Sequence, residues 1–179
     1  AGAAGAIFAA RGLIVRQAQA TLARARAELE LGDLATATDL AGAALRIVEE
    51  RALPWLGHEC HHLLARVAKA SGDFPAALAA CRAAIASIEQ VQNRLAIDLR
   101  GNFLADKLQT YHDAIDCCLR LPEPDAGAAF GLLERSKSRA LVDYLASNPE
   151  VRVRPGDPDD RELLAALAGL RAEHHWFYR

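Results

Sequence analysis

Apolar residues recur every three to four positions along most of the chain, which is the spacing of one face of an α-helix. The pattern predicts helices over residues 13–31, 34–52, 55–71 and 74–92, a longer helix over about 94–120, and another over about 126–146. Alanine and leucine are abundant whereas β-branched and aromatic residues are scarce, and this composition also favours helix. We therefore expect an all-α fold.

A short phrase occurs twice, about 40 residues apart. Leu31-Gly32-Asp33-Leu34 is followed by small residues in the same register as those that follow Ser71-Gly72-Asp73-Phe74. In each copy the glycine suits the left-handed end of one helix, and the aspartate suits the N-cap of the next. The matched small positions, which would let paired helices approach closely, are Ala37 with Ala77, Ala41 with Cys81, and Ala44 with Ala84. The repeat predicts antiparallel helix hairpins stacked in an array.

The composition and the hydrophobic pattern of the chain change after the sixth predicted helix. Residues 148–160 contain three prolines and few apolar side chains, which is typical of a linker. Residues 161–179 return to a helical pattern that runs to Arg179 with no stop signal. We expect a repeat array over residues 1–147, a linker over 148–160 and an exit helix over 161–179. Because the chain also contains no methionine, we interpret it as a piece of a longer polypeptide.

The net charge and the positions of the cysteines exclude several classes of protein. The chain has 21 Lys and Arg against 23 Asp and Glu, which gives a net charge of −2. Nucleic-acid and membrane-surface binders usually show a basic excess, so neither partner is expected. The four cysteines form no metal-binding pair of the CxxC type, which favours free thiols and a cytoplasmic location. No cofactor is predicted.

The repeated phrase, with Ala37 and Ala44 in the first copy, resembles the tetratricopeptide repeat. The string Ala129–Leu141, preceded by Phe103–Lys107 and Tyr111, looks like the last repeat of bacterial proteins in which such repeats precede a CHAT domain, a caspase-like peptidase fold. The resemblance covers about residues 15–179 and implies a right-handed superhelix of hairpins. It further implies a non-catalytic scaffold or sensor that binds a protein or peptide and regulates the adjoining domain. The family's catalytic His and Cys would lie beyond Arg179.

In such repeats the first helix of each hairpin lines the concave surface. That register places Gln19, Leu22, Arg26 and Glu30 on this surface in the first hairpin, and Glu59, His62, Arg66 and Lys69 in the second. Our candidate protein-binding residues are Arg26, Glu59, His62, Arg66 and Lys69. The ridge of Arg26, Arg66 and Lys69 would receive an acidic or C-terminal peptide segment. The alternative is a solvated face with charge pairs between residues four apart.

His58-Glu59-Cys60-His61-His62 matches the H-E-x-x-H motif of zinc peptidases. Its spacing puts two imidazoles one turn apart, with a glutamate as general base, and Glu89 on the partner helix is a conceivable third ligand. A zinc metallopeptidase is therefore the alternative function. Against it, enzymes of this type hold their substrate on a strand edge, and this sequence predicts no strand. A third alternative is the sensor array of a transcriptional regulator.

Three further clusters have less specific patterns. A run of charged residues lies on the sixth predicted helix, which is predicted to pack through Phe130, Leu133 and Leu141. The run consists of Glu134, Arg135, Lys137 and Arg139. These residues would either fix this hairpin against a following domain or form ion pairs within the helix. Cys117 and Cys118, near His112 and Asp113, are interpreted as a buried structural pair. The aromatic cluster Trp176-Phe177-Tyr178 is predicted to pack on residues 126–146 or to form an intermolecular contact.

Overall fold

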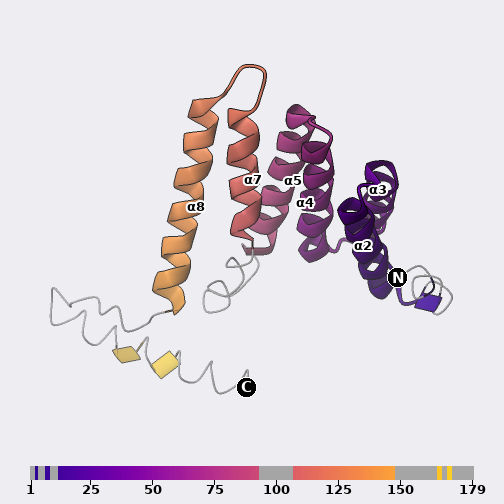
Figure 1. Cartoon of the computed structure of the whole chain (residues 1–179). Helices are drawn as coiled ribbons and strands as arrows, with labels where there is room; N and C mark the ends of the chain where they lie inside the picture. Colours follow the sequence, from indigo (N-terminus) through magenta and orange to yellow (C-terminus); the bar gives the residue numbers. More distant parts are fainter. Residues whose placement is uncertain are drawn as a thin grey trace. The chain divides into compact units, whose positions relative to one another are not determined.

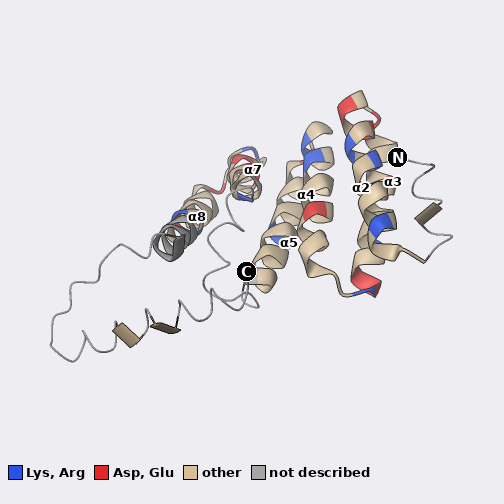
Figure 2. Ribbon diagram, turned by 90° about the horizontal axis from the view of Figure 1, so that it is seen from below, with Lys and Arg blue, Asp and Glu red and all other residues tan. Residues whose placement is uncertain are grey.

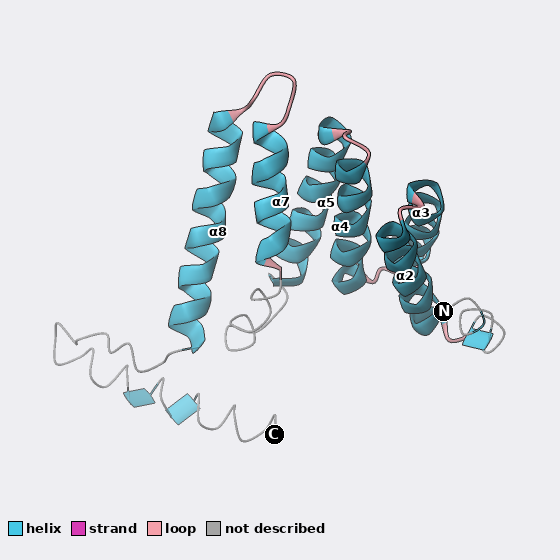
Figure 3. Ribbon diagram, viewed as in Figure 1, coloured by secondary structure: helices cyan, strands magenta, loops and turns pink. Residues whose placement is uncertain are grey.

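The computed structural model describes residues 12–92 and 107–147, together with short pieces at 3, 7–8, 165–166 and 169–170. The described residues form helices and turns, with no strand among them, and this confirms the all-α prediction (Figure 3). None of the described helices combines the length and the apolar character needed to span a bilayer.

The chain divides into two compact units, residues 1–147 and 148–179. The predicted linker at 148–160 lies outside the described residues. Of the predicted exit helix, only 165–166 and 169–170 are described, and these are helical. The aromatic cluster at its end also lies outside them.

Six helices are described in the first unit (Figure 1). They are α2 (Ile14–Leu31), α3 (Leu34–Glu50), α4 (Pro54–Ala70), α5 (Phe74–Gln92), α7 (Leu108–Leu119) and α8 (Ala126–Ser147). Five of these begin and end within two residues of the predicted bounds. The helix predicted over 94–120 is described only from Lys107 onward. Packing pairs α2 with α3, α4 with α5 and α7 with α8, and α3 contacts α4 as α5 contacts α7.

The repeated glycine-aspartate phrase ends one helix and starts the next, as predicted. Gly32 and Gly72 have φ angles of 86° and 79°, in the left-handed region that favours glycine. Asp33 Oδ1 then accepts a hydrogen bond from the backbone N–H of Thr36 at 3.0 Å, and Asp73 accepts one from Ala76 at 2.9 Å. Each aspartate thereby satisfies one N–H group that the start of a helix leaves without a partner.

Small side chains fill the places where helices cross. Ala37, Ala41, Ala77 and Cys81 are all buried, which confirms their predicted role in close packing. One buried cluster joins α2, α3 and α4, and a second joins α4, α5, α7 and α8. Leu22 belongs to the first cluster, so its predicted place on the binding surface is wrong. It lies four residues from buried Ala18, on the stripe of α2 that faces the core.

The packing face of α8 differs from the prediction. Phe130 is 63% exposed and Leu133 is also exposed, whereas Ala129 and Leu132 are buried against α5 and α7. The helix is therefore rotated by about one residue from the predicted face, since small Ala129 allows the closer approach that Phe130 would prevent. The side chain of Leu141 lies outside the described part of α8.

All four cysteines are free and buried, as predicted for Cys117 and Cys118. Burial raises the pKa of the Cys60 and Cys81 thiols to about 12. The thiolate is the reactive form of cysteine, so these side chains act as small packing groups at neutral pH.

Candidate functional site

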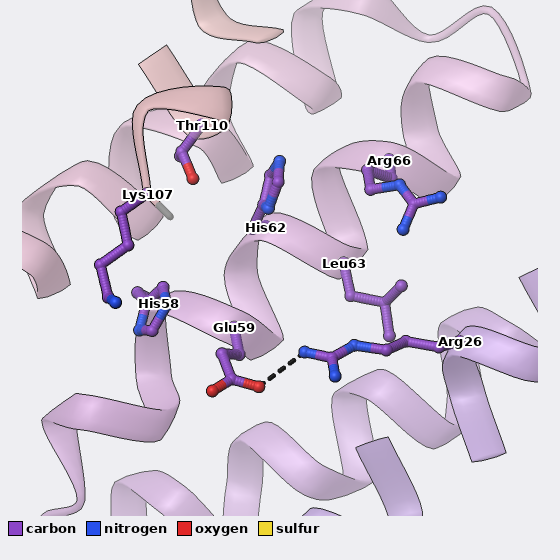
Figure 4. A pocket seen from close by; sticks show the side chains of 8 residues that line it. All are labelled: Arg26, His58, Glu59, His62, Leu63, Arg66, Lys107 and Thr110. Atoms are coloured by element: carbon purple, nitrogen blue, oxygen red, sulfur yellow. Dashed lines mark hydrogen bonds and ion pairs between the residues drawn. The ribbon is translucent and has the colours of Figure 1, made fainter. Parts of the chain in front are cut away.

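A polar groove of about 300 Å³ lies across α2, α4 and α7 (Figure 4). Each of these is the first helix of its hairpin, because α3, α5 and α8 follow them. The groove is lined by Arg26 of α2, by His58, Glu59, His62, Leu63 and Arg66 of α4, and by Lys107 and Thr110 at the start of α7. Four of the five candidate binding residues therefore lie together, and Lys69 lies outside the lining.

Exposed ion pairs join α2 to α4 along the groove. Arg26 Nη2 lies 2.6 Å from Glu59 Oε2, and Arg66 Nη2 lies 2.7 Å from Glu30 Oε1. Both arginines are exposed, and the Glu30 side chain is 69% exposed. Pairs in such surroundings contribute about 0–1 kcal/mol, because water competes for both charges. We call this contact the outer seam.

A more buried network joins α4 to α7, and we call it the inner seam. Its centre is Asp113, which is only 8% exposed. His62 Nε2 lies 2.8 Å from Asp113 Oδ2, and Lys69 Nζ donates to Oδ1 at 2.9 Å. Lys69 also lies 2.8 Å from Asp116 Oδ2. The inner seam therefore links two helices through one carboxylate that is largely shielded from water.

The hydrogen bonds of the inner seam hold its two carboxylates and the Lys69 ammonium in their charged forms. Burial by itself raises the pKa of Asp113, but hydrogen bonds and charge interactions with His62 and Lys69 outweigh it and keep that pKa well below its usual value. The hydrogen bond between Asp116 and Lys69 lowers the pKa of Asp116 and raises that of Lys69. The ammonium group of Lys69 is thus committed to two carboxylates within the protein.

The cations of the predicted ridge have partners that the sequence did not indicate. Arg26, Arg66 and Lys69 are each paired with a carboxylate from a neighbouring helix. Figure 2 shows basic and acidic positions mixed on α4 and α7 rather than gathered into one basic patch. The prediction counted the charges of each repeat separately, and it missed that acidic residues of the adjacent helices come to lie opposite.

The H-E-x-x-H spacing does place His58 and His62 in the same groove, yet their surroundings differ from a zinc site. His58 Nδ1 lies 2.9 Å from the Trp55 carbonyl oxygen, and His62 Nε2 is occupied by Asp113. Glu89, considered as a third ligand, forms an ion pair with Arg135 of α8. Within the described residues, no three His, Cys, Asp or Glu side chains gather into a group that could hold a metal ion.

Pairing within α8 accounts for only part of its charged run. Lys137 Nζ lies 3.3 Å from Glu134 Oε1 in the same helix, whereas Arg135 reaches α5. The side chain of Arg139 lies outside the described residues.

Sequence reasoning missed Lys107, Thr110 and Asp113 as residues of this region. Asp113 was considered only beside His112 and the cysteines, because its partner His62 is 51 residues away. A signal was present, since Asp113 falls on the same helical stripe as buried Thr110 and Cys117. A charged residue within a buried stripe predicts a partner on another element.

No protein-family model, curated protein or solved structure matches the chain.

Proposed function

We propose that the chain is a non-catalytic protein-interaction module of the tetratricopeptide type, a right-handed superhelix of hairpins that binds an acidic segment of a partner protein in the groove. The described hairpins and the repeated glycine-aspartate turns support this architecture. The observation that carries the binding role is the composition of the groove, where three Lys or Arg and two His side chains accompany a single Glu.

The outer seam supplies cations that a ligand can engage. Arg26 and Arg66 line the groove, and their present partners Glu59 and Glu30 are partly or largely exposed. A carboxylate of a bound segment can replace either glutamate as the partner of its arginine at little cost, because the existing pairs are weak. The released glutamate returns to water. The inner seam stays intact during this exchange, since Asp113 faces α4 from within the packed interface.

Fluorescence anisotropy with two labelled short peptides, one rich in Glu and one rich in Lys, tests this function. We expect the Glu-rich peptide to bind and the Lys-rich peptide to bind at least about tenfold more weakly. Replacing Arg66 by Ala should weaken binding of the Glu-rich peptide by about tenfold, as loss of one charge-assisted hydrogen bond predicts. Arg24→Ala is the matched control, because Arg24 lies on α2 but pairs with Glu28 of the same helix at 3.4 Å. Equal binding by both arginine variants would contradict the proposal.

Following the resemblance of residues 129–141, we further propose that this module regulates an adjoining caspase-like domain in a longer parent protein. The test is peptidase activity of that parent with and without the Glu-rich peptide. The peptide should change the activity of the unmodified parent and leave that of an Arg66→Ala variant unchanged. An identical response in the unmodified parent and in the Arg66→Ala variant would show that regulation does not depend on the groove.

A zinc metallopeptidase is the weaker candidate. Glu59, which would be the general base, is ion-paired with Arg26, and His62 is engaged by Asp113. Metal analysis after purification without chelators tests it. Stoichiometric zinc that is lost in both His58→Ala and His62→Ala would favour the peptidase over the interaction module.

A further inference from the structure

The two arginines of the outer seam differ in where their partners lie. Arg66 lines the groove, but its partner Glu30 is not among the described residues that line it. The Glu30 side chain is 69% exposed. In Figure 4 a dashed line joins Arg26 to Glu59, whereas none joins Arg66 to another of the residues drawn. Release of Glu30 would therefore leave Arg66 at the groove without moving a carboxylate into it.

The other cations of the predicted ridge are less suited to receive an anion. Arg26 and its partner Glu59 both line the groove, so an anion that takes Arg26 displaces a carboxylate that remains beside it and repels it. Lys69 lies outside the lining and is shared between two carboxylates of α7. Arg66 lies about two helical turns beyond Glu59 on α4, a rise of about 10 Å, which is near the screening length at physiological salt. An entering anion therefore meets the least repulsion at Arg66.

The existing pair of Arg66 sets a condition on the ligand. Glu30 is tethered within 2.7 Å of Arg66, so it competes with any ligand at a high effective concentration. A single ligand carboxylate offers the same chemistry as Glu30 and gains little by the exchange. A phosphate monoester carries about −1.5 to −2 charge at neutral pH and has three strong acceptor oxygens. It can accept two parallel N–H bonds from one guanidinium while carrying more charge than a carboxylate.

We propose that the groove prefers a segment with a phosphorylated side chain, whose phosphate replaces Glu30 as the partner of Arg66. This inference rests on the proposed function and names the acidic group that the groove selects. Glu30 turns to solvent, the Arg26–Glu59 pair and the inner seam stay in place, and no covalent bond is made or broken. Glu30 thus acts as an internal competitor, against which a segment without phosphate needs several carboxylates.

Fluorescence anisotropy of the whole chain with three forms of the Glu-rich peptide tests this preference. The forms carry phosphoserine, glutamate or alanine at one central position and are otherwise identical. We expect the phosphoserine form to bind about tenfold more tightly than the glutamate form, and the alanine form to bind most weakly. Inorganic phosphate serves as a competitor, and it should displace the phosphoserine form only at concentrations at least about a hundredfold above the Kd of that peptide.

Two charge-conserving substitutions assign the preference to one arginine. Arg66→Lys keeps the positive charge but removes the planar fork that binds two phosphate oxygens. The preference for the phosphoserine form should fall from about tenfold to about twofold, while the affinity for the glutamate form changes less than about twofold. Arg26→Lys is the matched control in the same seam, and it should keep the tenfold preference.

A second pair of variants tests the internal competitor. Glu30→Gln removes the carboxylate that the ligand has to displace, so both the phosphoserine and the glutamate form should bind about threefold more tightly. Glu28→Gln is its matched control on α2, because Glu28 pairs with Arg24 of the same helix. That variant should leave both affinities unchanged.

Equal affinity for the phosphoserine and glutamate forms would overturn the preference for phosphate and leave the proposed function standing. Failure of all three forms to bind would overturn the proposed function as well. A preference that persists in Arg66→Lys, or that is lost in Arg26→Lys, would overturn the assignment to Arg66. Unchanged affinities in Glu30→Gln would overturn the role of Glu30. Displacement by inorganic phosphate at the Kd of the peptide would mean that the groove takes free phosphate rather than a phosphorylated segment.

Discussion

The helix α4 forms ion pairs with both of its neighbours along the groove, but the two seams differ in burial. In the outer seam with α2, Arg26 and Arg66 meet glutamates near the surface. In the inner seam with α7, His62 and Lys69 converge on Asp113, which is almost entirely buried. Similar residue types therefore have different consequences. Water weakens the outer ion pairs, so a ligand can replace one of their partners. The buried carboxylate of Asp113 must keep its partners, because an unpaired charge is costly in the interior.

Substitution of Asp113 by Ala should destabilise the fold more than any other change in the two seams. It leaves Lys69 and His62 facing each other in a partly buried interface without their shared carboxylate. We expect the free energy of unfolding to fall by about 3 kcal/mol, as for the removal of one partner from a buried ion pair. Urea unfolding followed by circular dichroism measures this change. A loss below about 1 kcal/mol would mean that the inner seam behaves like an exposed one.

The pH dependence of stability should report the same carboxylate. The pKa of Asp113 is lower in the folded chain than its ordinary value of about 3.9 in an unfolded chain. On acidification the unfolded state therefore takes up the proton first, and stability falls. The contribution of Asp113 is complete above about pH 5 and is lost as the pH falls through the folded pKa. The difference in stability between the unmodified chain and Asp113→Asn should thus shrink between about pH 5 and pH 2. A difference that stays constant over this range would rule out Asp113 as its source.

Lys69 should have an intermediate effect, since its side chain is less buried than Asp113 but pairs with both Asp113 and Asp116. Lys69→Ala should lower the free energy of unfolding by about 1.5 kcal/mol, the usual scale for a hydrogen bond to a charged group. His62 and Gln109 continue to donate to Asp113 in that variant. An effect as large as that of Asp113→Ala would show that Lys69 alone holds the carboxylate in place.

Local sequence signals were sufficient for the helices and their turns. The left-handed φ angles of Gly32 and Gly72 and the N-caps of Asp33 and Asp73 depend on residues within four positions of each other. The same holds for the small side chains at the crossings, because the repeat register fixes them. Such features are predictable because their partners lie nearby along the chain.

The rotation of α8 and the pairing of charges depend on contacts between distant segments. Phe130 and Leu133 fit a helical stripe as well as Ala129 and Leu132 do, and only the distance between α7 and α8 decides between them. Arg66 lies 36 residues from Glu30, and His62 lies 51 residues from Asp113. Helical periodicity identified which residues reach the groove face, but not which opposite charges meet them there. The sequence therefore indicated the cations of the ridge, but not the carboxylates that pair with them in the two seams.

A substitution in the outer seam should change the free energy of unfolding least. Its ion pairs are weak, and for that reason a ligand can replace them. Glu59→Gln removes the charge that faces Arg26 while keeping the size of the side chain. We expect a change of less than about 0.5 kcal/mol in the free energy of unfolding, and a smaller one at high salt. The same variant should bind the Glu-rich peptide more tightly, because Arg26 then has no internal carboxylate to give up. Parallel urea unfolding and anisotropy titrations measure both quantities. A loss of stability similar to that of Asp113→Ala, or weaker peptide binding, would show that the Arg26–Glu59 pair is structural and that the two seams do not differ in kind.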